Sequence, residues 1–488
     1  MKVLLTVPPG RLFLTANHAT TPIGILYCAA YLEENGHSVK VVDSLTEKLN
    51  HEDVLRIISQ DDYVLIGISV ITDNRFSAFE LAVQIKERFP DKKIVLGGPH
   101  VTLDPIDTMR FHKAVDYIVA GEGETTLLEL VDTLKQNDNV SSVGGLYYRD
   151  GGDGKIKFSG AAELVTNLDK FPYPARHLID LERYGMYSEI KKRGRLESVN
   201  MVISRGCPIG CNFCSNTLIW GKSIRRRSNE NIINEIVYIK KRYKISSFAF
   251  QDDTFNFHKG KLVELCEEII RQNLNIYWSC AFRADNFDEK LIAIMKEAGC
   301  FRIHYGVESG SKRILDNVVK KKIDLNKVVH LSKLLNKYEI ENLPSFIISF
   351  PSETYNDALE TLSFMERLQA GPVLNICKIY PGTDIEKTAL EKGLLPKSFS
   401  WAEEKCMKEV KEAIPDLLGE VPFYVEKLTW LQISTILFKW SNTVDFDVWA
   451  SALSGIKSIR NINDLLRLMI MGIAYLKVKI KSVLLLKF

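Results

Sequence analysis

Residues 205–214 read RGCPIGCNFC and place three cysteines, Cys207, Cys211 and Cys214, in the spacing C-x3-C-x2-C. They follow directly on a strand-like run, Ser198–Ser204, so the cysteines occupy a loop at the carboxyl end of a predicted strand. Three thiolates on one short loop can each bind one iron of a [4Fe–4S] cluster, which leaves the fourth iron open to a small molecule. The two glycines of the loop let it wrap closely around a bulky inorganic core.

A zinc site and free thiols are the alternatives for this cysteine loop. Structural zinc sites are usually built from four ligands, often as Cys-x2-Cys pairs, and no fourth Cys or His lies near residues 207–214. The three residues could also be free buried cysteines, although clustering within eight residues favours a metal site.

Outward from the loop, strand-like and helical patterns alternate six times. The strand candidates are Ser198–Ser204, Ser247–Gln251, Tyr277–Ala281, Arg302–Val307, Leu343–Ser349 and Val373–Lys378. Helical patterns separate them, for example Asn229–Arg242 after Ser228. Six such units predict a partial parallel (β/α)6 TIM-like barrel over residues 197–394, with its working face at the carboxyl ends of the strands.

The first 135 residues also alternate between strands and helices. The predicted strands are Lys2–Val7, Ser38–Asp43, Tyr63–Ser69, Lys93–Leu96 and Asp116–Ala120. This order predicts an α/β domain with a doubly wound, flavodoxin- or Rossmann-like parallel sheet. Thr21 is the expected N-cap of the first helix, with Pro22 at its first position. Residues 136–196 are predicted to form a hairpin and linker, and residues 395–488 a mainly helical region.

Composition excludes several classes of protein. The chain has 488 residues, 64 Lys and Arg against 61 Asp and Glu, and a net charge of +3, which does not suggest nucleic-acid binding through bulk charge. Nine cysteines in so long a chain indicate a reduced, cytoplasmic protein rather than a disulfide framework. Neither a signal peptide nor a membrane-spanning apolar stretch is evident.

Three basic runs, Lys191–Arg193, Arg225–Arg227 and Lys320–Lys322, are expected to be solvated faces. Arg225–Arg227, soon after the cysteines, could instead attract an anionic substrate. Leu465–Leu486 combines many apolar residues with lysines. It is interpreted as a core-packing helix with a solvated face, and peripheral contact with a membrane surface is the alternative that is not favoured.

The cysteine motif, with aromatic Phe213 before its last Cys, resembles that of the radical S-adenosylmethionine (SAM) enzymes. The resemblance implies that Cys207, Cys211 and Cys214 bind a [4Fe–4S] cluster and that SAM binds its fourth iron. Segments at the strand ends match as well, including Gln251–Phe255, Gly306–Ser311, Ser345–Glu353 and Tyr380–Thr383. Ser345 and Ser349 stand where the family usually has glycine. The SAM-binding residues implied are Phe213, Asp252, Asp253, Arg283, Glu308, Ser309, Ser349 and Tyr380.

The first domain resembles the cobalamin (B12) domain of the cobalamin-dependent branch of this family. The cobalamin-binding residues implied are Ser69, Val70, Ile71, Thr72, Gly97, Gly98, Pro99, His100, Gly121, Glu122 and Gly123, and residues 21–24 also match. The signature D-x-H-x-x-G, which places a His under the cobalt, is absent, so we expect no protein His ligand; His18 and His100 are the alternatives. The alternative is a doubly wound domain that binds a different ligand. A nicotinamide cofactor is not expected, because no G-x-G-x-x-G motif follows the first strand.

The resemblance implies a cobalamin-dependent radical SAM enzyme, and a methyltransferase acting on an unactivated carbon is expected. In that family, reductive cleavage of SAM yields a 5′-deoxyadenosyl radical that activates the substrate, and methylcobalamin donates the methyl group. A non-methylating enzyme of the same family, for oxidative cyclisation or ring formation, is the first alternative. A non-catalytic cobalamin or iron–sulfur sensor is the second.

Expected partners are a small-molecule or lipid-like substrate and an electron donor such as flavodoxin or ferredoxin, with no nucleic acid. No catalytic side chain is assigned from the sequence.

Overall fold

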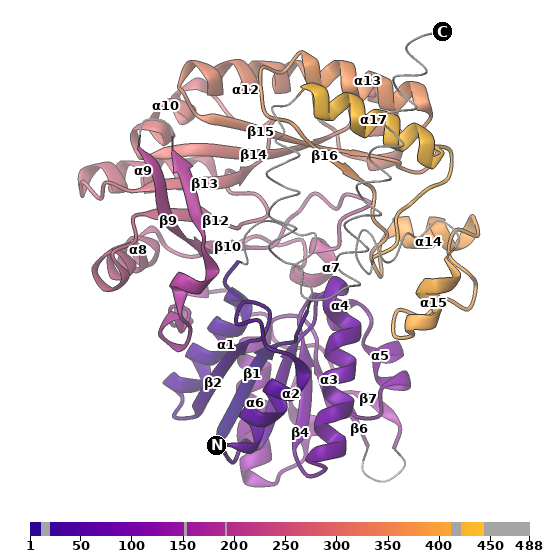
Figure 1. Ribbon diagram of the computed structural model, residues 1–488. Coiled ribbons are helices and arrows are strands. Elements are labelled where there is room, and N and C mark those ends of the chain that lie inside the picture. Colours follow the sequence, from indigo (N-terminus) through magenta and orange to yellow (C-terminus); the bar gives the residue numbers. More distant parts are fainter. Residues whose placement is uncertain (11–19, 151–153, 191–192, 411–420, 444–488) are drawn as a thin grey trace.

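The computed structural model describes residues 1–10, 20–150, 154–190, 193–410 and 421–443. Within these residues the chain forms two seven-stranded sheets and a short two-stranded one. Figure 1 shows the first sheet, in indigo and purple, below the second, in magenta and orange. In both sheets the strands alternate with helices along the chain, which confirms the predicted α/β fold class.

The first sheet has the strand order β2-β1-β3-β4-β5-β6-β7. Its first five strands are parallel, and β6 and β7 add an antiparallel hairpin at one edge. The bounds are Lys2–Val7 (β1), Ser38–Asp43 (β2), Leu65–Ser69 (β3), Lys93–Gly97 (β4), Tyr117–Val119 (β5), Leu146–Arg149 (β6) and Ile156–Phe158 (β7). The direction of winding reverses between β1 and β3, and ligands of open sheets bind at the strand ends beside such a point.

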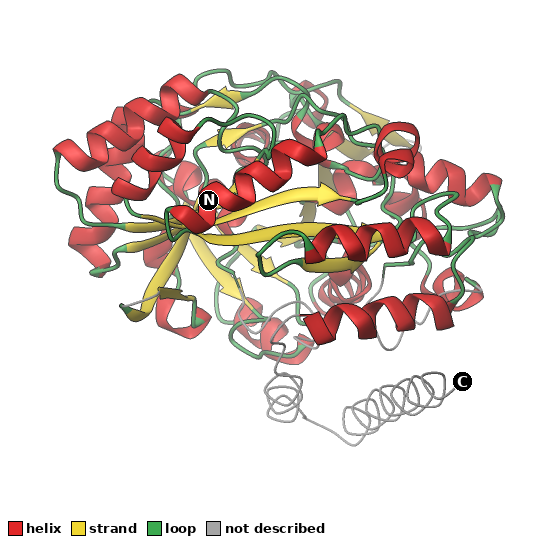
Figure 2. Ribbon diagram, turned by 90° about the horizontal axis from the view of Figure 1, so that it is seen from above, coloured by secondary structure: helices red, strands yellow, loops and turns green. Residues whose placement is uncertain are grey.

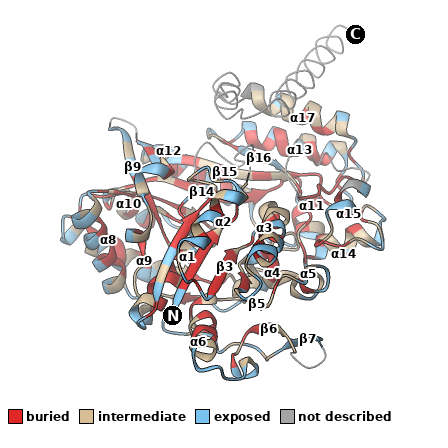
Figure 3. Cartoon of the chain, turned by 60° about the horizontal axis from the view of Figure 1, so that its bottom comes forward, coloured by how far each residue is buried: buried red, intermediate tan, exposed pale blue. Residues whose placement is uncertain are grey.

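Helices cover both faces of this sheet. Residues of α1 (Ile23–Glu34) and α6 (Gly123–Gln136) pack into one apolar cluster. Residues of α2 (His51–Ser59) and α3 (Arg75–Arg88) pack into another on the opposite face. Two short helices, α4 (Pro99–Leu103) and α5 (Pro105–Phe111), follow β4. Because strands β1 and β3 lie between both layers, they are buried, as Figure 3 shows in red.

The second sheet has the order β16-β15-β14-β13-β12-β9-β8, in which β8 alone is antiparallel. The bounds are Tyr187–Ile190 (β8), Gly194–Met201 (β9), Ser247–Phe250 (β12), Tyr277–Phe282 (β13), Cys300–Glu308 (β14), Glu341–Ile348 (β15) and Val373–Ile376 (β16). Six parallel strands form the predicted partial barrel. Each predicted strand overlaps an observed one because buried parallel strands are apolar on both faces and stand out in sequence.

Helices between the strands cover the outside of the partial barrel, as Figure 2 shows from above. They are α8 (Asn229–Tyr243), α9 (Lys259–Arg271), α10 (Glu289–Glu297), α11 (Lys312–Ile314), α12 (Leu325–Lys337) and α13 (Tyr355–Glu366). After β16 the described residues form α14 (Asp384–Glu391), α15 (Glu404–Glu409) and α17 (Trp430–Thr443). Between α15 and α17, Phe423 forms an isolated bridge with Lys378.

The cysteines lie on a loop whose two ends are held together by a pair of short strands. Strand β10 (Ser204–Arg205) pairs antiparallel with β11 (Arg225–Arg226), and Arg205 lies opposite Arg225. The loop between them carries the cysteines and the short helix α7 (Asn216–Trp220). Gly206 has φ +99°, and a Cβ there would lie 2.1 Å from the carbonyl oxygen of Ser223. Only glycine therefore fits at this point of the loop.

Two local predictions from sequence are wrong. Thr21 does not cap α1; Pro22 occupies the cap position, and the Thr21 hydroxyl donates to Asn200 on β9 instead. The run Arg225–Arg227 is not a solvated face, because Arg225 and Arg227 are each about 5% exposed and pair with Glu122 and Glu235. Both differences come from partners far away in the sequence.

The other basic runs and the lysine-rich tail are only partly covered by the structure. Lys321 lies in a half-buried position and pairs with Glu308, while Lys191 and Lys192 lie outside the described residues. The stretch 465–486 also lies outside them. In the part of the chain that the structure describes, none of the helices has the length and apolarity needed to cross a membrane.

Candidate cofactor-binding site

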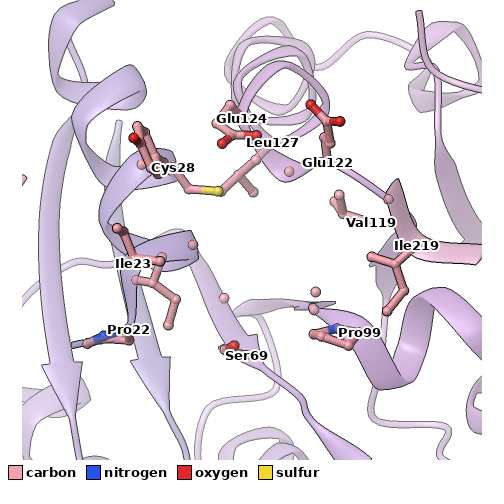
Figure 4. Close-up of a pocket in the computed structure, with 18 of the residues that line it drawn as sticks. Pro22, Ile23, Cys28, Ser69, Pro99, Val119, Glu122, Glu124, Leu127 and Ile219 are labelled. Carbon is pink, nitrogen blue, oxygen red and sulfur yellow. The ribbon is translucent and has the colours of Figure 1, made fainter. Parts of the chain in front are cut away.

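A large cavity lies where the carboxyl ends of the first sheet face the cysteine loop. The space between its walls, open solvent at its mouth included, is about 1420 Å³. Figure 4 shows Glu122 and Glu124 along one side of the cavity and Ser69 and Pro99 along the opposite side. Val202, Arg205 and Asp253 of the second sheet's loops also line it. The cavity is therefore shared by both halves of the molecule.

Glycines at the strand ends keep this cavity wide. A Cβ at Gly97 or Gly121 would meet no atom within 4 Å, so side chains there would project into open space. Gly98 has φ +105°, and a Cβ there would lie 2.8 Å from the carbonyl oxygen of Val70. This turn therefore requires glycine. A broad, flat ligand such as cobalamin fits a cradle of this kind.

The structure brings together seven of the eleven residues that the cobalamin resemblance implies. Those that line the cavity are Ser69, Gly97, Gly98, Pro99, Gly121, Glu122 and Gly123. Val70 and Thr72 are buried outside it, and Ile71 is 45% exposed on the surface. These three residues follow β3, where the chain turns away from the sheet into a 3-10 turn at Thr72–Asn74.

His100 does not line the cavity. It is fully buried, with Nδ1 3.3 Å from the Thr72 hydroxyl and its ring beside those of Phe79 and Trp401. Burial and the nearby Arg75 guanidinium hold the pKa of His100 well below its usual range, so the imidazole is neutral. His18, the other candidate, lies outside the described residues.

Several lining residues are absent from the sequence-based set. They come from α1, α6 and the segment that carries the cysteines: Tyr27, Cys28, Leu127, Arg205, Ile219 and Trp220. A partial signal for them exists, because residues 21–24 precede α1 and Arg205 opens the cysteine motif. The cavity forms where the two sheets meet. Local sequence does not show how the sheets meet, so it does not show which helix residues face the cavity.

The three cysteines of the loop are free and partly buried. Burial raises the pKa of Cys214 to about 11 and also raises that of Cys211, on which the positive charges of Lys321 and Arg283 act in the opposite direction. Both thiols must lose a proton before they bind a metal. Lys321 and Arg283 therefore favour the thiolate form that iron requires.

The cysteine loop is not a compact site for a single metal ion. Among the described residues, no group of three His, Cys, Asp or Glu side chains could hold one ion. A [4Fe–4S] cluster takes each thiolate at a different iron, so its ligands stand farther apart than those of one zinc ion. The free thiols of Cys207, Cys211 and Cys214 on a glycine-bearing loop fit such a cluster.

Four of the residues implied for SAM surround the cysteine loop. Asp253 lines the cavity and accepts a hydrogen bond from Asn216. The Glu308 carboxylate pairs with Lys321, and both charges act on the Cys211 thiol. Arg283 also acts on Cys211. Phe213 packs edge-on against Phe350, with ring centroids 5.6 Å apart.

Two buried polar atoms beside the loop fit a polar ligand. Arg283 Nη1 and Asp252 Oδ2 have no hydrogen-bond partner within the described residues. Unsatisfied buried groups of this kind are uncommon in folded proteins, and a ligand that binds beside them would account for both. The amino and carboxylate groups of SAM have the hydrogen-bonding capacity to satisfy them.

Three other residues of the SAM set have structural hydrogen bonds. Asp252 Oδ1 accepts from the Ser204 hydroxyl at 2.6 Å and from the backbone N–H groups of Ile203 and Ser204, and burial raises its pKa to about 6. Ser309 Oγ lies 3.0 Å from the Thr361 hydroxyl. Ser349 donates to the Tyr424 carbonyl at 2.6 Å. These bonds hold the strand ends in place.

Tyr380 lies half-buried in the loop that follows β16. Its carbonyl accepts from the Thr383 hydroxyl at 2.7 Å, and burial raises the pKa of its phenol. Two residues earlier, Lys378 lies 3.5 Å from Asp73 of the first domain. The end of the sixth barrel strand thus reaches the first domain.

Comparison with known proteins identifies two domains in the chain. Residues 12–131 match the B12 binding domain family, and residues 201–365 match the radical SAM superfamily. The chain is 35% identical to the uncharacterized methyltransferase PH0819 of Pyrococcus horikoshii over 81% of this chain and 84% of that protein. It is 27% identical to the cytidylyl-2-hydroxyethylphosphonate methyltransferase of Streptomyces wedmorensis over 72% and 73% of the two chains.

Solved structures share the fold at lower sequence identity. The radical SAM methyltransferase TsrM of Kitasatospora setae, with cobalamin and a [4Fe–4S] cluster bound, has a TM-score of 0.72 at 16% identity and covers 99% of both chains. The cobalamin-dependent radical enzyme OxsB has a TM-score of 0.71 at 19% identity, over 98% of this chain and 71% of that one. Both domain matches and the 35% identical relative show the family: the chain is a cobalamin-dependent radical SAM enzyme, and the cofactors of that family are a [4Fe–4S] cluster, SAM and cobalamin.

Proposed function

We propose that this enzyme is a methyltransferase that acts on an unactivated carbon atom. One observation carries the proposal: a single cavity is lined both by the strand ends of the B12 binding domain and by Ser204, Arg205 and Asp253 beside the cysteine loop. A cobalamin in this cavity would therefore face the place where SAM is activated. The two relatives described above are both named as methyltransferases, which supports the same reaction.

The bound cofactors supply the difficult chemistry, with an electron from the cluster, a radical from SAM and a methyl group on cobalamin. The protein binds and positions them. We assign the cluster to Cys207, Cys211 and Cys214, and the cobalamin cradle to the glycine turns after β4 and β5. The lining of the cavity is largely apolar, with Leu5, Val119 and Leu127 among its residues. Such walls keep water away from reactive radical species.

The roles of the SAM-binding residues differ in this proposal. Asp253, Arg283 and Glu308 lie near the cysteine loop, so we assign them to the polar groups of SAM, and Phe213 to its adenine. Asp252, Ser309 and Ser349 support the strand ends through the hydrogen bonds described above, and Asp252 keeps one free oxygen toward SAM. We also assign Tyr380, which follows β16, to the SAM site.

We further propose that the cobalt has no histidine ligand from the protein. His100 is buried behind the cavity wall with its ring against Trp401, which supports this assignment. An EPR spectrum of the Co(II) form tests it. Absence of nitrogen superhyperfine coupling is expected, whereas coupling from a histidine nitrogen would contradict the proposal.

A non-methylating reaction is the second candidate. The anaerobic magnesium-protoporphyrin IX monomethyl ester cyclase of Rubrivivax gelatinosus is 30% identical over 70% of this chain and 61% of that protein. Cobalamin and SAM would then serve an oxidative cyclisation rather than a methyl transfer. The products formed from SAM distinguish the two reactions.

The proposed test is anaerobic reconstitution with iron, sulfide and hydroxocobalamin, followed by reduction in the presence of SAM. Mass spectrometry would follow 5′-deoxyadenosine and S-adenosylhomocysteine. Both products are expected, and both should disappear in Cys211→Ala, which lacks one cluster ligand. Cys266→Ala is the matched control, because Cys266 is buried in the barrel core away from the loop. Deoxyadenosine without S-adenosylhomocysteine, with the true substrate present, would favour the cyclase-like reaction.

The partners and location of the enzyme are also proposals. We propose a small-molecule substrate, an electron donor such as flavodoxin or ferredoxin, and a cytoplasmic location. The electron-donor proposal rests on the need of the cluster for one electron at a low potential. Pull-down of either donor from an anaerobic extract, with loss of activity when it is depleted, would test this part.

A further inference from the structure

Four charged side chains, three of them buried, join the B12 binding domain to the cysteine loop. Glu122 and Glu124 lie at the start of α6, and Arg205 and Arg225 lie opposite each other on β10 and β11. Arg205 Nη1 lies 2.8 Å from Glu122 Oε2, and Arg205 Nη2 lies 2.5 Å from Glu124 Oε1. Arg225 Nη1 donates to Glu122 Oε2 at 3.1 Å, and its Nη2 donates to the other oxygen of the same carboxylate. We call these four residues the joint.

Glu122 is the central member of the joint. Its side chain does not cap α6, although Glu122 occupies the cap position. Both of its carboxylate oxygens instead bind arginines from the two strands that close the cysteine loop. Glu122 is 11% exposed, and its neighbours Gly121 and Gly123 line the cavity with it. One carboxylate therefore contacts both ends of the cluster-bearing loop and also borders the cobalamin cavity.

The surroundings make the joint stiff. Aromatic rings of Tyr27, Phe171 and Trp220 lie within 5.5 Å of the Arg205 guanidinium carbon, measured to each ring centroid. Two carboxylates balance two guanidinium groups, so the joint is neutral. Removing one charge from such a set leaves its partner uncompensated, which is strongly destabilising when the partner is buried. The two strands and the start of α6 are therefore held in one arrangement.

We infer that Glu122 is a positioning residue that holds the cysteine loop at a set distance from the cobalamin cavity, so that cluster assembly and cobalamin binding strengthen each other. The inference rests on the cofactor assignments proposed above. Cobalamin in the cavity would contact residues 121–123, and the cluster would hold the loop between Arg205 and Arg225. Each cofactor thus stabilises the arrangement of the joint that the other needs, which is a coupling free energy between two sites.

The test measures the dissociation constant of hydroxocobalamin by absorbance titration, with full-length protein that carries the reconstituted cluster and with iron-free protein. For the wild type we expect binding at least fivefold tighter with the cluster, at the lower end of the roughly 5–150-fold range of such couplings. In Glu122→Gln the ratio should fall to about one, and Glu122→Asp should restore part of it. Visible absorbance and EPR confirm the cluster in each variant.

Glu235→Gln is the matched control. Glu235 also pairs with two arginines, Arg176 and Arg227, neither of which belongs to the joint, and it is fully buried. It should keep the wild-type ratio despite a similar loss of stability, which thermal melting monitors. If Glu122→Gln does not fold, Glu122→Asp and Arg225→Lys provide the same comparison, because each keeps the charge and alters the geometry.

Several outcomes would overturn the inference. A ratio of one in the wild type would do so, as would a ratio in Glu122→Gln equal to that of the wild type. Loss of the ratio in Glu235→Gln would show that any buried carboxylate has the same effect. Wild-type protein that binds no cobalamin in either form would instead contradict the proposed function itself. The binding constants thus separate failure of the inference from failure of the function.

Discussion

The ammonium group of Lys321 lies 2.8 Å from the Glu308 carboxylate, at the end of the fourth barrel strand, and the same group donates to the Gly306 carbonyl at 2.7 Å. Lys321 comes from the basic run 320–322, which the sequence predicts to be a solvated face. The two charges compensate each other beside Cys211. Lys321 therefore holds the Glu308 carboxylate in a set orientation next to the proposed cluster.

Replacement of this carboxylate should stop SAM cleavage without loss of the cluster. Glu308→Gln removes the charge that we assign to SAM and leaves Lys321 unpaired, so we expect a decrease in deoxyadenosine formation of roughly 100-fold, the scale of a misplaced reactant. The cluster EPR signal should remain. Glu341→Gln serves as the control, since Glu341 pairs with Arg302 at the exposed start of β15. Equal activity of Glu308→Gln and wild type would contradict the assignment.

Ser349 offers a test of backbone strain at a position where the family usually has glycine. It has φ +69°, a conformation that costs a non-glycine residue about 1 kcal/mol, and its hydroxyl makes a buried hydrogen bond worth about 1 kcal/mol. Ser349→Gly removes both contributions, so its free energy of unfolding should stay within about 0.5 kcal/mol of wild type. Ser349→Ala loses only the bond and should be destabilised by about 1 kcal/mol. Urea unfolding measures both, and equal effects would contradict the strain argument.

Glu353 should make the stability of the protein depend on pH. Burial raises the pKa of its carboxyl to about 8 from an ordinary value of 4.5. Between these two pH values the folded protein binds more protons than the unfolded chain, so the free energy of unfolding decreases as the pH rises through this window. Above pH 8 the full penalty of burying the charge is present.

Glu353→Gln should therefore be more stable than wild type above pH 8, on the order of 5 kcal/mol, and differ little below pH 4.5. Urea unfolding at pH 5 and at pH 8.5 measures the difference. Asp91→Asn, at an exposed position, should show no such dependence. A pH-independent difference between Glu353→Gln and wild type would show that the carboxyl titrates normally.

Trp401 should be essential for the contact between the C-terminal region and the B12 binding domain. Its backbone carbonyl accepts from Arg75 Nε at 2.9 Å, and its buried ring lies beside His100. Trp401→Ala removes a large buried side chain, so we expect a loss of about 3–5 kcal/mol in the free energy of unfolding. Trp401→Phe should lose much less. Faster cleavage of the B12 binding domain by a protease in Trp401→Ala alone would support this role, and equal cleavage rates would count against it.

The sequence predicts the two sheets and the family because both depend on local signals. Buried parallel strands appear as short apolar runs, and the cysteine spacing is typical of one kind of cofactor. Both predictions are confirmed. The roles of individual residues stay predictions, although the structure places most of the expected cobalamin residues around one cavity.

What the sequence could not show depends on contacts between distant segments. Thr21 has the chemistry of a helix cap, but its partner Asn200 is 179 positions away. The run Arg225–Arg227 has the pattern of a solvated face, but Glu122 lies 103 positions earlier in another domain. His100 follows a strand end and was a candidate ligand, yet it packs against Trp401 from the C-terminal region. Local patterns indicate none of these partners.

The contact of Arg75 with Trp401 also has a consequence for synthesis. The two residues are 326 positions apart, and ribosomes add roughly 5–20 residues per second. After Arg75 has been synthesised, about 15–65 s therefore pass before the segment that covers Arg75 and His100 has been made. During that interval a side of the domain that is buried in the complete protein is exposed to water, and a chaperone would have its best opportunity to bind there.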